Sequence, residues 1–275
     1  MRAFVLELGQ QSKLAFTLTV PRLVHAHTKE KLRILAQYLP VYLQVTKNAL
    51  DRIYVDAFAG PGLNRIKDTG EDLPGSPLIA AEAVAQNGTR FSRLVFIEQN
   101  RETFGELAEA LARRGADPRI ELVHGDANAE LPQIVRSLNR RAPTFIFLDT
   151  DGIEPRWSTI RAISPWRTEL LINFPLGMAI NRNITSPKVL DYFGTAAATA
   201  IWESGRSGWR RELLDVYKAR LKELGYEHSP LDRLIKARGG QHLYYLIHVS
   251  KVEPAKRIME WVQRQADAEG QLPML

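Results

Sequence analysis

The sequence predicts an α/β fold built on a doubly wound, mostly parallel sheet. In the middle of the chain, short apolar runs rich in β-branched and aromatic residues alternate with amphipathic helical patterns. Runs that are apolar at nearly every position are typical of strands buried on both faces, which need helices on both sides of the sheet. The expected strands cover 52–58, 93–98, 119–126, 144–149 and 169–174. The expected helices between them cover about 77–87, 100–114, 128–140 and 157–163.

Two flanking regions add helices and a hairpin to this core. On the N-terminal side, helical spacing predicts a helix from Thr28 to about Thr46, with Thr28 as its cap and Pro40 as a point where it kinks or divides. On the C-terminal side, the expected elements are a helix over 208–224, paired strands at 225–232 and 243–250, and a last helix over 254–268.

No internal repeat or low-complexity linker divides the chain, so we expect one domain over residues 1–275. Residues 14–24 give no firm element, and residues 176–207 are hard to interpret. The parts of the domain are expected to be a helical N-terminal extension (1–50), a cofactor-binding core (51–175), a helical insertion (176–224) and a C-terminal hairpin with a helix (225–275).

Composition narrows the class of protein. The 275 residues are 45% hydrophobic and 25% charged, which is the ordinary balance of a globular protein and excludes a disordered or coiled-coil chain. The chain has no cysteine, so disulfides, thiolate metal sites and cysteine nucleophiles are excluded. It also has no apolar run long enough to span a membrane and no signal-peptide pattern, so we expect a cytoplasmic protein without a membrane partner.

The net charge of +6 is distributed unevenly. Residues 1–53 carry a net +5 and residues 201–275 a net +3, whereas residues 54–200 carry a net −2. Basic ends around an acidic centre suit an enzyme whose arms hold a polyanion, and they are explained equally well by solvated helix faces. The candidate polyanion contacts are Lys29, Lys31, Arg210 and Arg211.

The segment YVDAFAGPG (54–62) predicts a strand that ends in an acidic residue, followed by a tight glycine turn and a helix. Glycines let the backbone approach a ligand where a side chain would clash. The dinucleotide fingerprint GxGxxG and the loop GxxxxGK[ST] are absent. An acidic residue at this place repels pyrophosphate and pairs with an ammonium group. S-adenosylmethionine (SAM) fits best, because it carries a positive centre and no phosphate. The expected cofactor contacts are Asp56, Phe58, Gly60, Pro61 and Gly62.

Acidic residues also stand where the next three expected strands end. Glu98 ends the second expected strand and is placed to accept from both ribose hydroxyls of SAM. In GDAN (125–128), Asp126 is placed to accept from the adenine amino group. FLDTDG (147–152) ends the fourth expected strand and is placed beside the methyl group. A helix cap or solvent exposure explains any one of them, whereas four in succession indicate a cofactor site. The further expected cofactor contacts are Glu98, Gly125, Asp126 and Ala127.

Taken together, YVDAFAGPG, GSPL (75–78), IE (97–98), GDAN and the FLD strand end resemble the three-Cys-motif partner (TcmP) proteins, a bacterial and phage-associated group. The similarity extends from HTKEKL (27–32) to YYLIHVSKVEPAKRIM (244–259). The resemblance implies a class I SAM-dependent methyltransferase fold of the Rossmann-like type. It also implies a three-cysteine, radical-SAM-like partner protein, often connected with nucleic-acid modification or repair. The three cysteines then belong to another polypeptide.

Two positions depart from the expected patterns. Phe58 stands where the common class I turn has its first glycine, a form shared with cytosine-C5 DNA methylases. Thr150 stands where the family usually has proline, which removes the rigid turn that N6-adenine methylases use to hold an amine. Because a cysteine nucleophile is absent, cytosine-C5 methylation is excluded, and transfer to a nitrogen or a hydroxyl remains.

Candidate catalytic and acceptor-binding residues follow the fourth and fifth strands. Asp149 and Asp151 are candidates for a general base. Alternatively, Asp149 hydrogen-bonds the following loop and Asp151 belongs to a simple turn. Asn173, Phe174 and Arg182 are candidates to stack on or hydrogen-bond an acceptor base, with core packing as the alternative for Phe174.

These observations favour a SAM-dependent methyltransferase that acts on a nucleic acid or nucleotide-like substrate. One alternative is a non-catalytic binding or scaffold protein on the same fold. A weaker alternative is a metal-dependent nucleic-acid hydrolase with Asp56, Asp126, Asp149 and Asp151 around magnesium. No separate metal site is expected, because the pair His25 and His27 lacks a further ligand.

Overall fold

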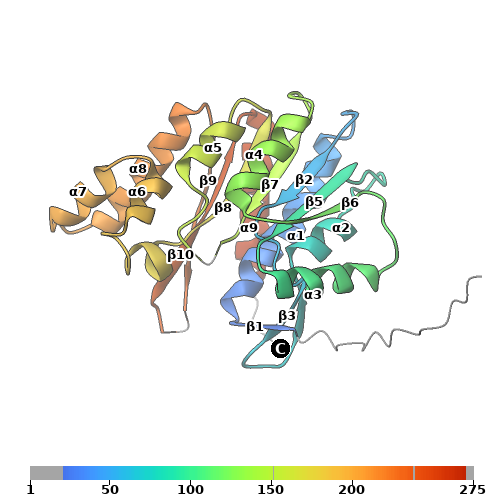
Figure 1. Ribbon diagram of the computed structural model, residues 1–275, viewed down its shortest axis with the longest axis horizontal. Helices are drawn as coiled ribbons and strands as arrows, with labels where there is room; N and C mark the ends of the chain where they lie inside the picture. Colours follow the sequence, from blue (N-terminus) through green and yellow to red (C-terminus); the bar gives the residue numbers. More distant parts are fainter. Residues whose placement is uncertain (1–20, 151, 238, 271–275) are drawn as a thin grey trace, which may run out of the picture.

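The computed structural model describes residues 21–150, 152–237 and 239–270. Within them, a seven-stranded sheet has the order β6-β5-β2-β7-β8-β10-β9 (Figure 1). Neighbours among β6, β5, β2, β7 and β8 pair in parallel, and β10 is antiparallel to β8 and β9. This confirms the predicted α/β class and mostly parallel sheet. The strands are β2 (Ile53–Asp56), β5 (Arg93–Glu98), β6 (Ile120–His124), β7 (Thr144–Leu148), β8 (Thr168–Phe174), β9 (Glu227–Lys236) and β10 (His242–Ser250).

Helices cover both faces of the sheet, which explains why its strands are apolar at consecutive positions. The core consists of two clusters of buried residues, one on each face of the sheet. In β7, Phe145 and Phe147 belong to the first cluster, while Ile146 and Leu148 belong to the second. The first cluster also contains residues of α1 (His27–Val45), α2 (Ser76–Glu82), α3 (Arg101–Ala112) and α9 (Glu253–Gly270). The second is completed by α4 (Ala127–Ser137), α5 (Trp157–Ile163) and the helices that follow β8.

The glycine turn is not followed directly by a helix, so that expectation is wrong. The chain instead forms a hairpin of β3 (Leu63–Ile66) and β4 (Asp72–Pro74), and β1 (Arg22–Val24) pairs in parallel with β3. The backbone N–H of Gly75 donates to the carbonyl of Gly62 at 2.7 Å and closes the base of this hairpin. Helix α2 therefore begins beside the turn despite the intervening residues.

The helices at the two ends differ from the predictions in detail. Helix α1 continues through Pro40, and its N-terminal flanking residue is Ala26 without a side-chain cap, rather than Thr28. Residues 176–207 contain a π-helix, η1 (Leu176–Ile180), and two short helices, α6 (Pro187–Phe193) and α7 (Ala197–Glu203). They precede α8 (Trp209–Glu223) and lie with it at one end of the molecule (Figure 1). Helices of two turns are too short to display a helical period in the sequence.

No helix in the described part of the chain is both long enough and apolar enough to span a membrane.

Candidate cofactor and transfer site

Four acidic side chains stand in a row along the carboxyl edge of the parallel sheet. Asp56 ends β2 and Glu98 ends β5, while Asp149 directly follows β7 and Asp126 follows β6. Because β6, β5, β2 and β7 are neighbours in that order, the topology brings these four predicted residues to one edge. Asp151, the other predicted catalytic residue, lies outside the described residues.

Glu98 holds the glycine turn against the end of β5 by hydrogen bonds. Its Oε2 accepts from the backbone N–H of Gly60 at 2.9 Å, and its Oε1 accepts from the N–H of Asn100 at 2.8 Å. Gly60 has φ +66°, and a Cβ at this position would have only an Arg22 nitrogen within 4 Å, at 3.9 Å. The backbone of the turn is therefore accessible on that side, next to a half-buried carboxylate of fixed orientation.

Gly62 faces the protein interior, so a side chain at this position should destabilise the fold. The backbone has φ +79°, and an added Cβ would lie 3.1 Å from Leu107 Cδ1 and 3.2 Å from Ala110 Cβ of α3. We expect Gly62→Ala to lower the free energy of unfolding by about 2 kcal/mol. Gly105→Ala is the control, because nothing lies within 4 Å of that Cβ and alanine favours the helix. Urea denaturation of both variants checks this, and equal stability of Gly62→Ala and wild type would contradict it.

Asp56 is fully buried beneath the turn. Its carboxylate accepts from the hydroxyl of Tyr54 at 3.2 Å, from the N–H of Phe58 at 3.4 Å and from the side chain of Ser76. Burial raises its pKa to about 7, with a further contribution from the charge of Asp149, and the Ser76 hydrogen bond opposes the rise. Asp56 thus titrates near neutral pH. The role of Ser76 was missed from the sequence, which predicted only a helix start at this position.

Asp149 forms a nearly buried polar cluster with two side chains from other elements. Lys31 Nζ of α1 lies 2.6 Å from its carboxylate, and Asn173 Nδ2 of β8 donates to it at 2.9 Å. The Lys31 and Asp149 side chains are only 9% and 14% exposed. Asn173, predicted as an acceptor contact, therefore lies beside the predicted base.

Lys31 does not belong to a solvated basic arm, so that expectation is wrong for this residue. It lies on the same helical stripe as the buried residues Leu35, Tyr38 and Tyr42, at spacings of four, seven and eleven. That spacing is the sequence signal that could have identified it as an inward-facing lysine.

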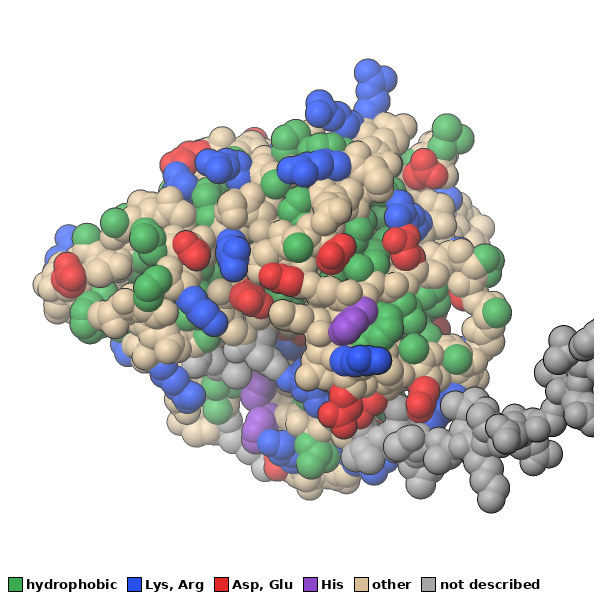
Figure 2. All heavy atoms as spheres, in the orientation of Figure 1, with side chains coloured by type: hydrophobic (Ala, Val, Ile, Leu, Met, Phe, Trp, Pro, Cys, Tyr) green, Lys and Arg blue, Asp and Glu red, His purple; other side chains and the backbone are tan. Residues whose placement is uncertain are grey.

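The other candidate basic contacts also have local partners. Lys29 pairs with Glu71 at 2.9 Å, Arg211 pairs with Asp215 at 3.2 Å, and the guanidinium of Arg210 lies over the Trp209 ring. Figure 2 shows basic and acidic side chains interspersed on the visible face, without a single-sign patch. These side chains are solvent-exposed with local partners, as the solvated-face alternative predicts.

The loops around the cluster are held by short polar side chains. Thr150 is buried, and its hydroxyl accepts from the N–H of Gly152 at 2.9 Å, which closes the turn where the resembled family has proline. Asp126 caps α4 by accepting from the N–H of Asn128 at 2.8 Å, so the cap alternative is realised at this half-buried position. Burial, and then the charge of Asp126, raise the pKa of the nearby Glu154, which the sequence did not single out.

The remaining predicted residues have different surroundings. Phe174 is fully buried, with ring centroids 5.9 Å from Tyr192 and 5.2 Å from Tyr217, so it packs in the core and is not placed to contact an acceptor. Phe58 is half-buried against the core, and Arg182 is exposed after η1. Pro61 and Ala127 are buried, and Gly125 is half-buried beside Glu130.

The described residues do not favour a metal-dependent hydrolase. No group of three or more histidine, cysteine, aspartate or glutamate side chains in that part of the chain is arranged to hold a metal ion. Asp149 is neutralised by Lys31, and the rings of His25 and His27 stack with centroids 5.6 Å apart.

The described residues form an α/β fold of the Rossmann-like kind, in which the last two strands of a mostly parallel sheet, β10 and β9, are antiparallel. No family model matches the sequence. No curated protein matches it either. Among solved structures, a Legionella pneumophila protein of the DUF519 family is 14% identical, with a TM-score of 0.51 over 87% of this chain and 92% of that one.

Two further solved structures are similar at lower scores. Trm1 of Pyrococcus horikoshii, in complex with SAM, is 11% identical with a TM-score of 0.47 over 83% of this chain and 57% of that one. An O-methyltransferase of Bacillus cereus, in complex with S-adenosylhomocysteine, is 13% identical with a TM-score of 0.46 over 83% of this chain and 92% of that one.

Proposed function

We propose that the protein is a cytoplasmic SAM-dependent methyltransferase that modifies a nitrogen or oxygen of a nucleic acid or nucleotide-like acceptor. The observation that carries this proposal is the glycine turn held by Glu98 above a buried Asp56, at the carboxyl edge of the sheet. This arrangement offers an open backbone and a row of carboxylates, and it has no phosphate-binding loop. It suits a cofactor that carries hydroxyl and ammonium groups but no phosphate.

Each acidic residue has a proposed role in holding that cofactor. Glu98 is oriented by two backbone N–H groups, and its remaining lone pairs would accept from the ribose hydroxyls. Asp56 would attract the ammonium group through its charge from below the turn, and Asp126 would accept from the adenine amino group. SAM, when bound, supplies a methyl group on a positively charged sulfur.

The cluster of Asp149, Lys31 and Asn173 supports a role for Asp149 in proton transfer. Lys31 and Asn173 hold its carboxylate in one orientation at the carboxyl edge of the sheet, beside the proposed transfer site. A carboxylate so placed would accept a hydrogen bond from an acceptor N–H or O–H and take the proton as the methyl group is transferred.

Binding of SAM tests the cofactor assignment. Calorimetry should show saturable binding of SAM and S-adenosylhomocysteine. Glu98→Gln should weaken both by at least about tenfold, because the amide loses acceptor capacity toward Gly60 and the ribose. Glu102→Gln is the matched control, since Glu102 is exposed in the first turn of α3. Absence of binding at millimolar SAM would contradict the proposal.

The acceptor class requires a separate experiment. Methyl-tritiated SAM should label RNA, DNA or nucleotide extracts in the presence of the protein, and Asp149→Asn should abolish the labelling while SAM still binds. Label in protein or in other small molecules would overturn the acceptor class. Binding without any transfer would favour the scaffold alternative.

A three-cysteine, radical-SAM-like partner protein forms the last part of the proposal. It rests on the resemblance to TcmP proteins and on the absence of cysteine from this chain. Co-expression with a candidate partner should give a complex in size-exclusion chromatography, and separate elution of the two proteins would contradict this part alone.

A further inference from the structure

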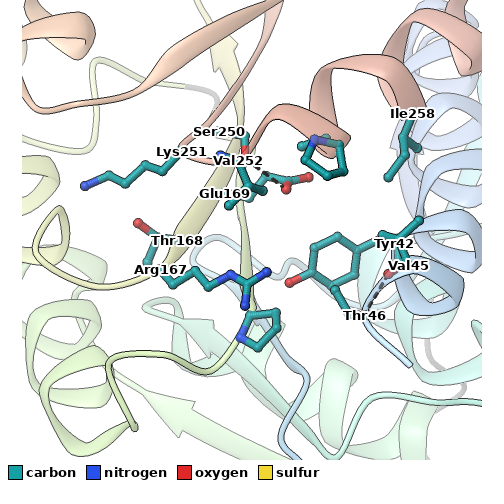
Figure 3. A pocket seen from close by; sticks show the side chains of 13 residues that line it. Tyr42, Val45, Thr46, Arg167, Thr168, Glu169, Ser250, Lys251, Val252 and Ile258 are labelled. Atoms are coloured by element: carbon teal, nitrogen blue, oxygen red, sulfur yellow. Dashed lines mark hydrogen bonds between the residues drawn. The ribbon is translucent and has the colours of Figure 1, made fainter. Parts of the chain in front are cut away.

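A small cavity lies at the edge of the sheet opposite to the glycine turn (Figure 3). It forms where β7 and β8 begin, where β10 ends, and where the ends of α1 and α9 meet; Val45, Pro143, Thr168, Ser250 and Ile258 are among its lining residues. Its volume is about 100 Å³. A cavity of about 150 Å³ is known to hold the six carbons of a benzene molecule, so this one has room for about four non-hydrogen atoms inside it, with further ligand atoms at its mouth.

The hydroxyl of Tyr42 lacks a partner in this cavity. Tyr42 is 3% exposed, and its hydroxyl forms no hydrogen bond with any described residue. Figure 3 shows this hydroxyl pointing into the cavity, toward the guanidinium of Arg167. By contrast, Tyr38, one turn earlier on α1, donates its hydroxyl to Glu169. Burial, and then the charge of Glu169, raise the pKa of Tyr42 well above its ordinary value, so the hydroxyl remains a donor.

Arg167 supplies a second set of donors at the mouth of the cavity. Its backbone is fixed by hydrogen bonds with Arg140 and Thr144, at 3.0 and 3.2 Å. Its exposed guanidinium forms no ion pair with the described residues of the chain. A guanidinium facing an unpartnered hydroxyl suits a planar anion, which both groups can bind at once.

The nearby acid, Glu169, is bound by other side chains of the protein and not by Arg167. Glu169 accepts from Tyr38, from His248 Nε2 at 2.9 Å and from Ser250 Oγ at 3.2 Å, so its carboxylate leaves the donors of Tyr42 and Arg167 to a ligand. The remaining wall is largely apolar, with Val45 and Ile258 on the helix side. An apolar wall disfavours inorganic phosphate, because oxygens turned toward carbon would lose their hydrogen bonds to water.

We propose that this cavity binds a small monocarboxylate, which places its carboxylate between Tyr42 and Arg167 and its short aliphatic body against Val45, Pro143 and Ile258. The site is independent of the proposed methyl transfer, since it lies at the other edge of the sheet. It constitutes a second ligand site.

Isobutyrate, which has six non-hydrogen atoms, is the probe for a direct test. Titration of the full chain, followed by two-dimensional amide NMR, should show saturable shifts near α1 and the start of β8. Isobutyramide and inorganic phosphate should bind at least about tenfold more weakly, because the amide has lost the charge and phosphate does not suit the apolar wall. Equal binding of isobutyramide or preferential binding of phosphate would overturn the proposal.

Two variants connect the binding to the named groups. Tyr42→Phe should leave the free protein at least as stable as wild type, because the removed hydroxyl has no described partner. It should also weaken isobutyrate by at least about tenfold, as should Arg167→Gln. Arg161→Gln is the control, because Arg161 is an exposed arginine in α5. Unchanged affinity in Tyr42→Phe, or absence of saturable shifts in wild type, would refute the site.

Discussion

SAM should bind this protein at least about tenfold more tightly at pH 7.5 than at pH 5.5, because the proposed attraction of its ammonium group by Asp56 requires an ionised carboxylate. Burial raises the pKa of Asp56 to about 7, so most of the free protein carries a neutral Asp56 at pH 5.5. Binding at that pH must release a proton, and the apparent affinity falls with the ionised fraction. Calorimetry in buffers of different ionisation enthalpy measures both quantities.

The Asp56→Asn variant separates this mechanism from other causes of pH dependence. It should bind SAM weakly and show little change in affinity with pH, since the titrating group is gone. Asp191→Asn, an exposed carboxyl on α6, should behave as wild type. A wild-type affinity that is constant between pH 5.5 and 7.5 would contradict the assignment of Asp56.

The raised pKa of Asp56 should also make the folded protein less stable at high pH than at low pH. An acid whose pKa is higher in the folded protein holds its proton there while the unfolded chain loses it, so stability falls as the pH rises from about 4 to about 7. A change from 3.8 to about 7 corresponds to about 4 kcal/mol. Asp56→Asn should therefore be more stable than wild type at pH 8, and similar to it near pH 4. Urea denaturation at both values tests this directly.

Lys31→Met should destabilise the protein by about 3 kcal/mol or more, because it leaves the carboxylate of Asp149 without its nearly buried cationic partner. The control lies two residues earlier on the same helix. Lys29→Met removes an ion pair with Glu71 whose side chains are 54% and 47% exposed, so it should cost less than about 1 kcal/mol. Chemical denaturation at neutral pH compares the two variants.

A double variant identifies the origin of the Lys31 effect. Asp149→Asn removes the charge that Lys31→Met leaves unpaired, so the combined variant should recover part of the lost stability. Equal small effects of Lys31→Met and Lys29→Met would show that the Lys31–Asp149 pair is not held away from water.

The sequence was sufficient to predict the sheet because its strands are buried on both faces. Phe145 to Leu148 are apolar at successive positions since the two sides of β7 contact different clusters. The position of the glycine turn and of the acidic strand ends could also be predicted, because neighbouring parallel strands bring their carboxyl ends to one edge of the sheet. The β3–β4 hairpin was not predicted, since its strands of four and three residues are stabilised by pairing with β1, which is distant in sequence.

The individual side chains of the site were harder to predict than its location. Counting charges placed Lys31 in a basic arm, because a count ignores which face of a helix a residue occupies. Phe174 ends a strand at the correct edge, but only the packing of Tyr192 and Tyr217 against it shows that it faces the core. The hydrogen bond of Ser76 to Asp56 depends on closure of the hairpin between them, which no local pattern reveals.

The hydrogen bond between Gly75 and Gly62 fixes the base of the hairpin separately from its tip. The backbone leaves the glycine turn and returns to it at one point, so the path from the turn to α2 does not depend on how many residues lie between. Insertion or shortening at the hairpin tip, near Gly70, should leave the turn and the helix start unmoved. The tip therefore offers an attachment point for a fluorescent reporter of events at the glycine turn.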